Sequence, residues 1–313
     1  MKKSGRRTKK GLSSFSASED SLLRFHRFLS LVISGIRDAY LIDCLSNLST
    51  PYIKSLLPSR YHLHLLLVEL DDQRMIANKE NLLRKMKNQR RECEAKMRSH
   101  YVFDTSRACT TLLSIVESNT LIIQLISVLE TQLATNTLSE SLNIIHLSSS
   151  SVCLPFATGW LLGYPAIYYQ PVNTTSTTAA ADPFDASNTM SSLSMCQLQK
   201  VSISAKVSLL TGKPRKECME AALIDLLEFT YPLSYATDSE GSDEDLKSSL
   251  LRLELLVQER VDDITKRVSN SSSPPNLTED EDHTKGLSHY LEDLMVADVH
   301  KESTVVVMSS LIF

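Results

Sequence analysis

Glycine and aromatic residues are scarce in this chain of 313 residues. It has eight glycines, one tryptophan and 6% aromatic residues. So few glycines exclude a collagen-like or glycine-rich class and argue against a phosphate-binding loop built from backbone amides. The string TGKP at residues 211–214 is no such loop, because Val207 and Pro214 stand where the loop needs a glycine and a hydroxyl residue. We therefore expect no cofactor.

Closely spaced cysteines and long apolar runs are missing as well. The six cysteines lie at positions 44, 93, 109, 153, 196 and 218. None are spaced as C-x-x-C, so they predict neither a zinc site nor a redox motif. No run approaches the roughly 18 apolar residues of a membrane span, and no secretory signal follows the basic start MKKSGRRTKK. We expect a cytoplasmic or nuclear protein without a membrane span, whose cysteines are free thiols.

Charge is distributed unevenly along the chain, although the net charge is only −4. Residues 1–100 carry a balance of +10, residues 101–216 are neutral, and residues 217–313 carry −14. Such a gradient could attract an acidic partner to one end and a basic partner to the other. The alternative is attraction within the chain together with solvated surfaces.

Hydrophobic periodicity predicts alternating helices and strands. Helices are expected at residues 21–36, 51–57, 74–98, 107–135, 214–228, 243–268 and 287–295. Strands are expected at residues 39–44, 62–70, 101–104, 142–147, 166–169, 196–210 and 304–308. This alternation is typical of an α/β fold with a mainly parallel central sheet and helices on both faces.

The domain organisation that we expect is a single α/β domain over residues 18–313. Residues 1–17 read as a disordered basic tail. Two inserts, 172–194 and 269–286, are rich in small polar or acidic residues and cannot bury enough apolar area to offset chain entropy. Both are predicted to be disordered.

Several strings in the second half of the chain resemble one family. They are LLGYPAIYY, the later CQLQKVSISAKVSLLTGKP, FTYPLSY and an apolar carboxyl-terminal strand. In this order, and with the early LIDC, they resemble the "chromosome 1 open reading frame 74" family, a group of unknown function. The resemblance covers residues 39–313 and includes the element Leu162–Pro165. It implies no activity and no functional residue.

Two carboxylates end predicted strands, namely Asp43 and Asp104. Ligands of open parallel sheets bind beyond the carboxyl ends of the strands, so the pair could bind magnesium or act as acid and base. Cys44 could serve as a nucleophile if a histidine lay nearby. The alternative is that the aspartates cap turns and the cysteine is buried. His62 and His64 share a strand face and could hold a metal, although satisfied or exposed histidines are more common.

Two functions from different classes remain open. The first is a non-catalytic interaction protein that uses the basic segment 74–98 or the acidic carboxyl-terminal region. The second is an enzyme on a nucleotide-binding-like sheet. The basic segment has nine Lys or Arg and three Glu but few residues that read bases, so it does not favour nucleic acid. A shared cleft for Asp43, Cys44, Asp104 and Trp160 would favour the enzyme.

Acidic residues follow several hydroxyl residues late in the chain. Thr237, Ser239 and Ser242 lie in TDSEGSDED, and Thr278 precedes EDED. We expect these sites to be phosphorylated by acid-directed kinases. A phosphate on Ser242 would stabilise the amino end of the helix expected to follow it. The alternative is an acidic loop that only solubilises the chain.

Overall fold

The computed structural model describes most of the first two thirds of the chain and parts of the last third. It describes residues 18–43, 45, 49–106, 110–135, 142–170, 197–210, 222–233, 236–237, 251–252, 255, 258–259, 262–267 and 293–307. Only the backbone is described at 206–210, 222–223, 236–237 and 293–307. The predicted disordered ranges 1–17, 172–194 and 269–286 lie outside these residues, so the predictions for them stand untested.

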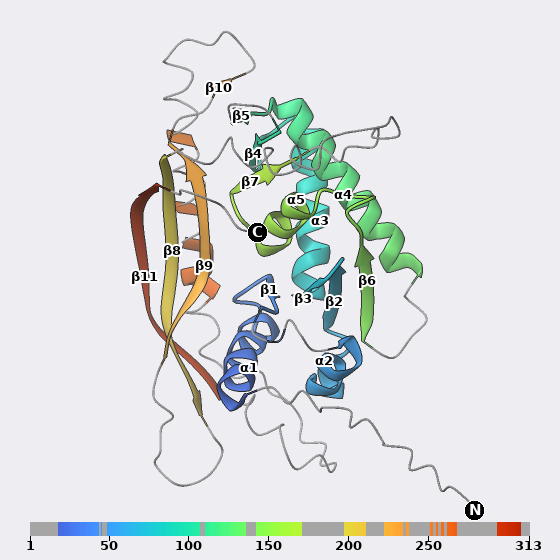
Figure 1. The fold of residues 1–313 in the computed structure, drawn as a ribbon, viewed down its shortest axis with the longest axis vertical. Coiled ribbons are helices and arrows are strands. Elements are labelled where there is room, and N and C mark those ends of the chain that lie inside the picture. Colours follow the sequence, from blue (N-terminus) through green and yellow to red (C-terminus); the bar gives the residue numbers. More distant parts are fainter. Residues whose placement is uncertain are drawn as a thin grey trace, which may run out of the picture.

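Helices and strands are interspersed up to residue 162 of the described chain, and strands predominate after it (Figure 1). The helices are α1 (Glu19–Ile33), α2 (Thr50–Leu56), the 3-10 turn η1 (Ser59–Tyr61), α3 (Lys79–Glu94), α4 (Ile115–Thr135) and α5 (Leu154–Leu162). The strands are β1 (Ala39–Leu41), β2 (Leu65–Leu70), β3 (Gln73–Asn78), β4 (Tyr101–Asp104), β5 (Thr111–Leu112), β6 (Asn143–Leu147), β7 (Ala166–Tyr169), β8 (Gln197–Leu210), β9 (Ala222–Pro232), β10 (Ala236–Thr237) and β11 (Asp293–Val307). Residues 262–267 are also helical.

The described strands form three sheets, so the expected mainly parallel central sheet is wrong. The first sheet has the order β1-β3-β2-β6, and only its β2–β6 pair is parallel. The second, β10-β5-β4-β7, combines two parallel pairs with the antiparallel pair β4–β5. The third, β11-β8-β9, is antiparallel throughout. Parallel and antiparallel pairs both occur because hairpins such as β2–β3 give antiparallel pairs, whereas crossovers through a helix give parallel pairs.

Strand β3 was missed because its residues were assigned to the helix predicted at 74–98. β2 and β3 form a hairpin through Asp71 and Asp72, and Asp71 has a left-handed backbone with φ 51°. Such turns usually carry glycine, which is absent here. The helix predicted at 107–135 is likewise shorter, since the strand β5 precedes α4.

Strand β9 replaces part of the helix predicted at 214–228. It pairs with β8, and the register passes from Ile203 opposite Leu227 to Ser204 opposite Asp225, so Leu226 is an extra, bulged residue. Leu226 and Leu227 are therefore both buried. A bulge of this kind interrupts the two-residue period of a strand and makes the apolar pattern resemble that of a helix. β11 similarly starts inside the helix predicted at 287–295.

Two hydrophobic cores lie on opposite faces of the first and second sheets. Leu65 and Leu67 of β2 enter the core shared with α1, β8 and β9, whereas Leu66 and Val68 enter the core shared with α3, α4 and α5. This alternation follows from the two-residue period of a strand. Figure 1 shows the third sheet standing along one side of the molecule, away from α4.

Candidate functional site

The candidate site is built on α3, whose sequence favours a helix throughout. It lacks glycine and proline, and Asn78 caps its start by accepting a hydrogen bond from the Asn81 backbone at 3.0 Å. Its buried side carries the apolar Leu82 and Met86, but also the amides of Asn81 and Gln89. Buried amides require hydrogen-bond partners, so other elements must reach α3 at these two points.

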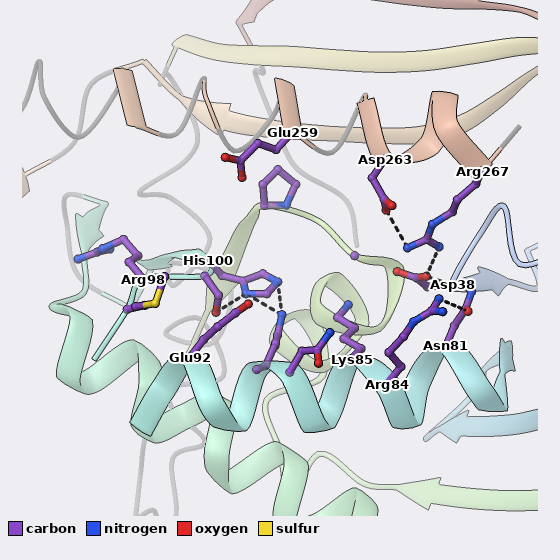
Figure 2. A pocket seen from close by; sticks show the side chains of 16 residues that line it. Asp38, Asn81, Arg84, Lys85, Glu92, Arg98, His100, Glu259, Asp263 and Arg267 are labelled. Carbon is purple, nitrogen blue, oxygen red and sulfur yellow. Dashed lines mark hydrogen bonds and ion pairs between the residues drawn. The ribbon is translucent and has the colours of Figure 1, made fainter. Parts of the chain in front are cut away.

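A cavity of about 400 Å³ separates α3 from the helical residues 258–259 and 262–267 (Figure 2). We call it the α3 cleft. Its other walls are the residues that precede β4 and the turn between α5 and β7. Four cations and four carboxylates line it, namely Arg84, Lys85, Arg98, Arg267, Asp38, Glu92, Glu259 and Asp263. The α3 cleft is therefore a polar site with balanced charge.

One end of the cleft is closed by Arg267. Its guanidinium lies 2.7 Å from Asp38 Oδ1 and 2.7 Å from Asp263 Oδ2, and it also donates to the Gly35 carbonyl. These contacts raise the pKa of Arg267 against the opposing effect of its burial. Asn81 donates to the same carbonyl at 3.1 Å. This network attaches helical residues 262–267 to α3 and to the turn after α1.

Trp160, the only tryptophan of the chain, lies beneath the cleft and contacts two of its lining residues. Trp160 is fully buried, and its indole nitrogen donates to the side-chain oxygen of Gln89. Lys85 donates to the Trp160 carbonyl and lies 4.6 Å from the indole ring centroid. Such a cation–π contact holds the ammonium in place. Gln89 and Lys85 are thus positioned by a residue of the core.

Ser99 and His100 form a contact in the cleft that resembles a nucleophile–base pair. The Ser99 hydroxyl lies 3.1 Å from His100 Nδ1. A catalytic triad also needs a carboxylate on the second ring nitrogen. In this structure the Gln89 amide nitrogen lies 3.3 Å from both ring nitrogens. The Gln89 amide is thus equally close to the nitrogen that faces Ser99 and to the second nitrogen, and these contacts hold the buried His100 ring in place.

Glu92 and Glu259 are the two carboxylates of the cleft that accept no hydrogen bond from any described side chain. Glu92 is half-buried on α3, and burial raises its pKa above the ordinary value of 4.5. Glu259 is exposed on the facing segment. Figure 2 shows the Glu92 side chain extending toward His100, with Glu259 on the opposite wall. Together they leave negative charge that nothing described in the cleft neutralises directly.

A second cavity, of about 540 Å³, lies between α1, β1, β9 and the α5–β7 turn. We call it the arginine pocket because Arg24, Arg27 and Arg37 line it. Asp43 lies at this pocket, where it accepts hydrogen bonds from Arg24 at 3.2 Å and from the Tyr40 hydroxyl at 3.1 Å.

The predicted catalytic residues do not meet in either described pocket. Asp43 lines the arginine pocket, whereas Asp104 is buried, lines neither pocket, and accepts hydrogen bonds from the backbone and hydroxyl of Ser106. Cys44 lies outside the described residues. Trp160 underlies the α3 cleft instead. The catalytic assignment of Asp43, Cys44 and Asp104 stays a prediction.

The two histidines considered as metal ligands have separate contacts. His62 Nε2 lies 3.0 Å from the Leu57 carbonyl, and His64 lies 3.8 Å from the Glu80 carboxylate. Within the described ranges, no three His, Cys, Asp or Glu side chains are grouped as a metal would require.

The predicted phosphorylation sites fall mainly outside the described residues. Ser239, Ser242 and Thr278 are not described, and Thr237 is described only as backbone in β10. Their modification stays a prediction.

The lining residues of the α3 cleft were missed by sequence reasoning. Glu92, Ser99 and His100 belong to no recognisable motif, and the cleft forms only where Glu259, Asp263 and Arg267 face α3. One signal was available, because Asn81 and Gln89 interrupt the apolar side of an otherwise amphipathic helix.

Comparison with known proteins gives a family and no activity. The family model described as "Domain of unknown function (DUF4504)" matches residues 3–252. No curated protein matches the chain, and no solved structure matches it. In the part of the chain that the structure describes, none of the helices is long and apolar enough to cross a bilayer. With the match extending over most of its length, this chain belongs to the DUF4504 family.

Proposed function

We propose that this protein is a non-catalytic interaction protein of the cytoplasm or nucleus, and that its α3 cleft receives charged side chains of a partner protein. The two walls of the cleft are the regions that the charge gradient singles out, the basic helix and the acidic carboxyl-terminal third. Charged surfaces of both signs favour a partner that carries the complementary pattern.

The observation that carries the proposal is that several charged side chains of the cleft have no ion pair with a described residue. Glu92 and Glu259 have no ion pair with any described residue, and Arg84 is held only by the neutral Asn81 side chain, at 2.7 Å. Desolvating an unpaired carboxylate is unfavourable, which is why the pKa of Glu92 is raised. A basic side chain of a partner placed between Glu92 and Glu259 would remove this penalty.

A non-catalytic role is supported by how the reactive groups are held. Lys85 is engaged by Trp160, and the His100 ring is enclosed by Gln89 and Ser99. An enzyme with Asp43 and Asp104 at strand ends is the alternative. The two carboxylates line no common pocket among the described residues, which supports the interaction role.

We also propose a cytoplasmic or nuclear location and a finer family position. Cys93 and Cys153 are free and buried, which agrees with a reducing compartment. The element Leu162–Pro165 supports a place in the "chromosome 1 open reading frame 74" group. Gly163 in this element has φ 80° and ends α5, a backbone conformation that favours glycine.

The test is affinity purification of the full chain from eukaryotic cells, followed by mass spectrometry. We expect partners that co-purify with the wild type to be lost with the double variant Glu92→Gln/Glu259→Gln. The matched control is Glu80→Gln/Glu94→Gln, which removes the same charge from the parts of α3 that do not line the cleft. Identical partners for both double variants would refute a role of the cleft in binding.

A further inference from the structure

Helix α1 and the turn after it bring three guanidinium groups to one cavity. Arg24 and Arg27 are three residues apart and so share a side of the helix. Phe25 and Leu29 on the buried side are fully enclosed, which fixes the orientation of α1. Arg37 follows in the turn that leads to β1 and lines the same arginine pocket.

Arg27 is the least satisfied of the three arginines. Its Nε atom is buried and has no hydrogen-bond partner, and its guanidinium makes no ion pair with a described residue. A buried donor without an acceptor is destabilising, and more so when it is charged. Because the Nε atom is itself enclosed, an anionic ligand in the pocket would be bound by the terminal nitrogens of Arg27, and those bonds would offset the cost of burying the group.

Arg37 is held in position but is also poorly satisfied. Its guanidinium carbon lies 5.1 Å from the ring centroid of Phe28 and 5.9 Å from that of Tyr40, and these two rings are stacked on each other. The one described hydrogen bond of the guanidinium, to the Asp225 carbonyl, is long at 3.5 Å. Burial lowers the pKa of Arg37, and nearby tyrosine and carboxylate groups oppose that change only in part. The Arg37 guanidinium is therefore held in position, and several of its N–H groups remain available to an acceptor.

The carboxylates of the arginine pocket each have a hydrogen-bond or ion-pair partner other than Arg27 or Arg37. The pairs are Asp43 with Arg24 at 3.2 Å, Glu228 with Lys200 at 3.0 Å, and Asp225 with Ser202 at 3.0 Å. The lining has three arginines and three carboxylates and is neutral by itself; Lys200, which pairs with Glu228 from outside the lining, brings the total to +1. Neither Arg27 nor Arg37 therefore forms an ion pair with a described residue, and their terminal nitrogens remain as donors for an anionic ligand.

We propose that the arginine pocket binds the phosphate group of a small organic phosphate monoester. A phosphate monoester offers three acceptor oxygens and a charge of about −1.5 to −2, which suits two guanidinium groups. The cavity of about 540 Å³ is larger than a phosphate and falls in the range of small-molecule sites. Leu41, Leu162 and Tyr164 provide a wall for the organic part of the ligand.

The test uses phenyl phosphate as the probe and isothermal titration calorimetry as the measurement on the full chain. We expect binding by the wild type and a loss of at least about tenfold in affinity in Arg27→Gln and in Arg37→Gln, because each removes a charge-assisted hydrogen bond. Arg91→Gln is the matched control, since Arg91 is exposed on α3 and lines neither pocket. Its affinity should equal that of the wild type.

A second measurement separates ligand binding from folding. Arg27→Met should unfold at the same temperature as the wild type or higher without ligand, while its midpoint should no longer rise with phenyl phosphate. Benzoate that binds as tightly as phenyl phosphate would overturn the assignment to phosphate. If a phosphotyrosine peptide binds to the protein but phenyl phosphate does not, the assignment to a small molecule would be overturned. Equal affinities for the wild type and Arg27→Gln would overturn the site itself.

Discussion

The ion pair between Asp38 and Arg267 should contribute strongly to stability, because it joins two distant parts of the chain in a poorly solvated place. Only 9% of the Asp38 side chain and 22% of the Arg267 side chain are exposed, and the two atoms lie 2.7 Å apart. Removing one partner of a buried pair costs about 3–5 kcal/mol. Because Arg267 keeps some exposure and a second carboxylate, Asp263, we expect about 2–3 kcal/mol for Asp38→Asn or Arg267→Gln.

A double-mutant cycle measured by urea unfolding isolates this pair. Trp160 is buried, so its fluorescence reports the transition. The coupling energy between Asp38→Asn and Arg267→Gln should be about 1–3 kcal/mol.

The exposed pair Arg90–Glu130 provides the control for that cycle. Its atoms are closer, at 2.6 Å, but its side chains are 40% and 49% exposed. Its coupling should be only about 0.2–1 kcal/mol. The reasoning is refuted if the Asp38–Arg267 coupling does not exceed that of the exposed pair. Residues 262–267 would then not be attached to the core through Arg267, and they would not form a wall of the α3 cleft.

Three further variants test the geometry of the α3 cleft. Glu92→Gln should raise the free energy of unfolding at neutral pH. Burial raises the pKa of Glu92 in the folded state, so its ionised form opposes folding; the gain should shrink as the pH falls and vanish below the ordinary pKa of 4.5 in pH-dependent urea unfolding. Trp160→Phe should cost about 1–3 kcal/mol, since it leaves a void and an unpaired Gln89 oxygen; calorimetric melting that matches the wild type would contradict the contact. Gly163→Ala should cost about 1 kcal/mol by the same measurement because of its φ of 80°, and no loss would mean that α5 ends differently.

Local sequence pattern determined much of the secondary structure. The apolar runs at β2, β4, β6 and β7 and the alternation along β8 were all predicted as strands, and α1 was predicted as a helix. These elements bury side chains with a regular period, which a single stretch of sequence records. The charge gradient was also readable, and it pointed to the two regions that face each other across the α3 cleft.

Strand direction and the two pockets were decided by tertiary structure. Strands β3 and β9 were hidden because their identity depends on partners, β2 in one case and a bulged pairing with β8 in the other. A mainly parallel sheet was predicted from the alternation of elements, which does not encode the order in which strands pair. The cavities have the same origin: Glu92 faces Glu259, and Arg27 shares a pocket with Glu228, only because packing brings remote segments together. The sequence specifies which groups are charged, whereas the packing of α3 and α1 against later segments decides which of those charges remain without a partner.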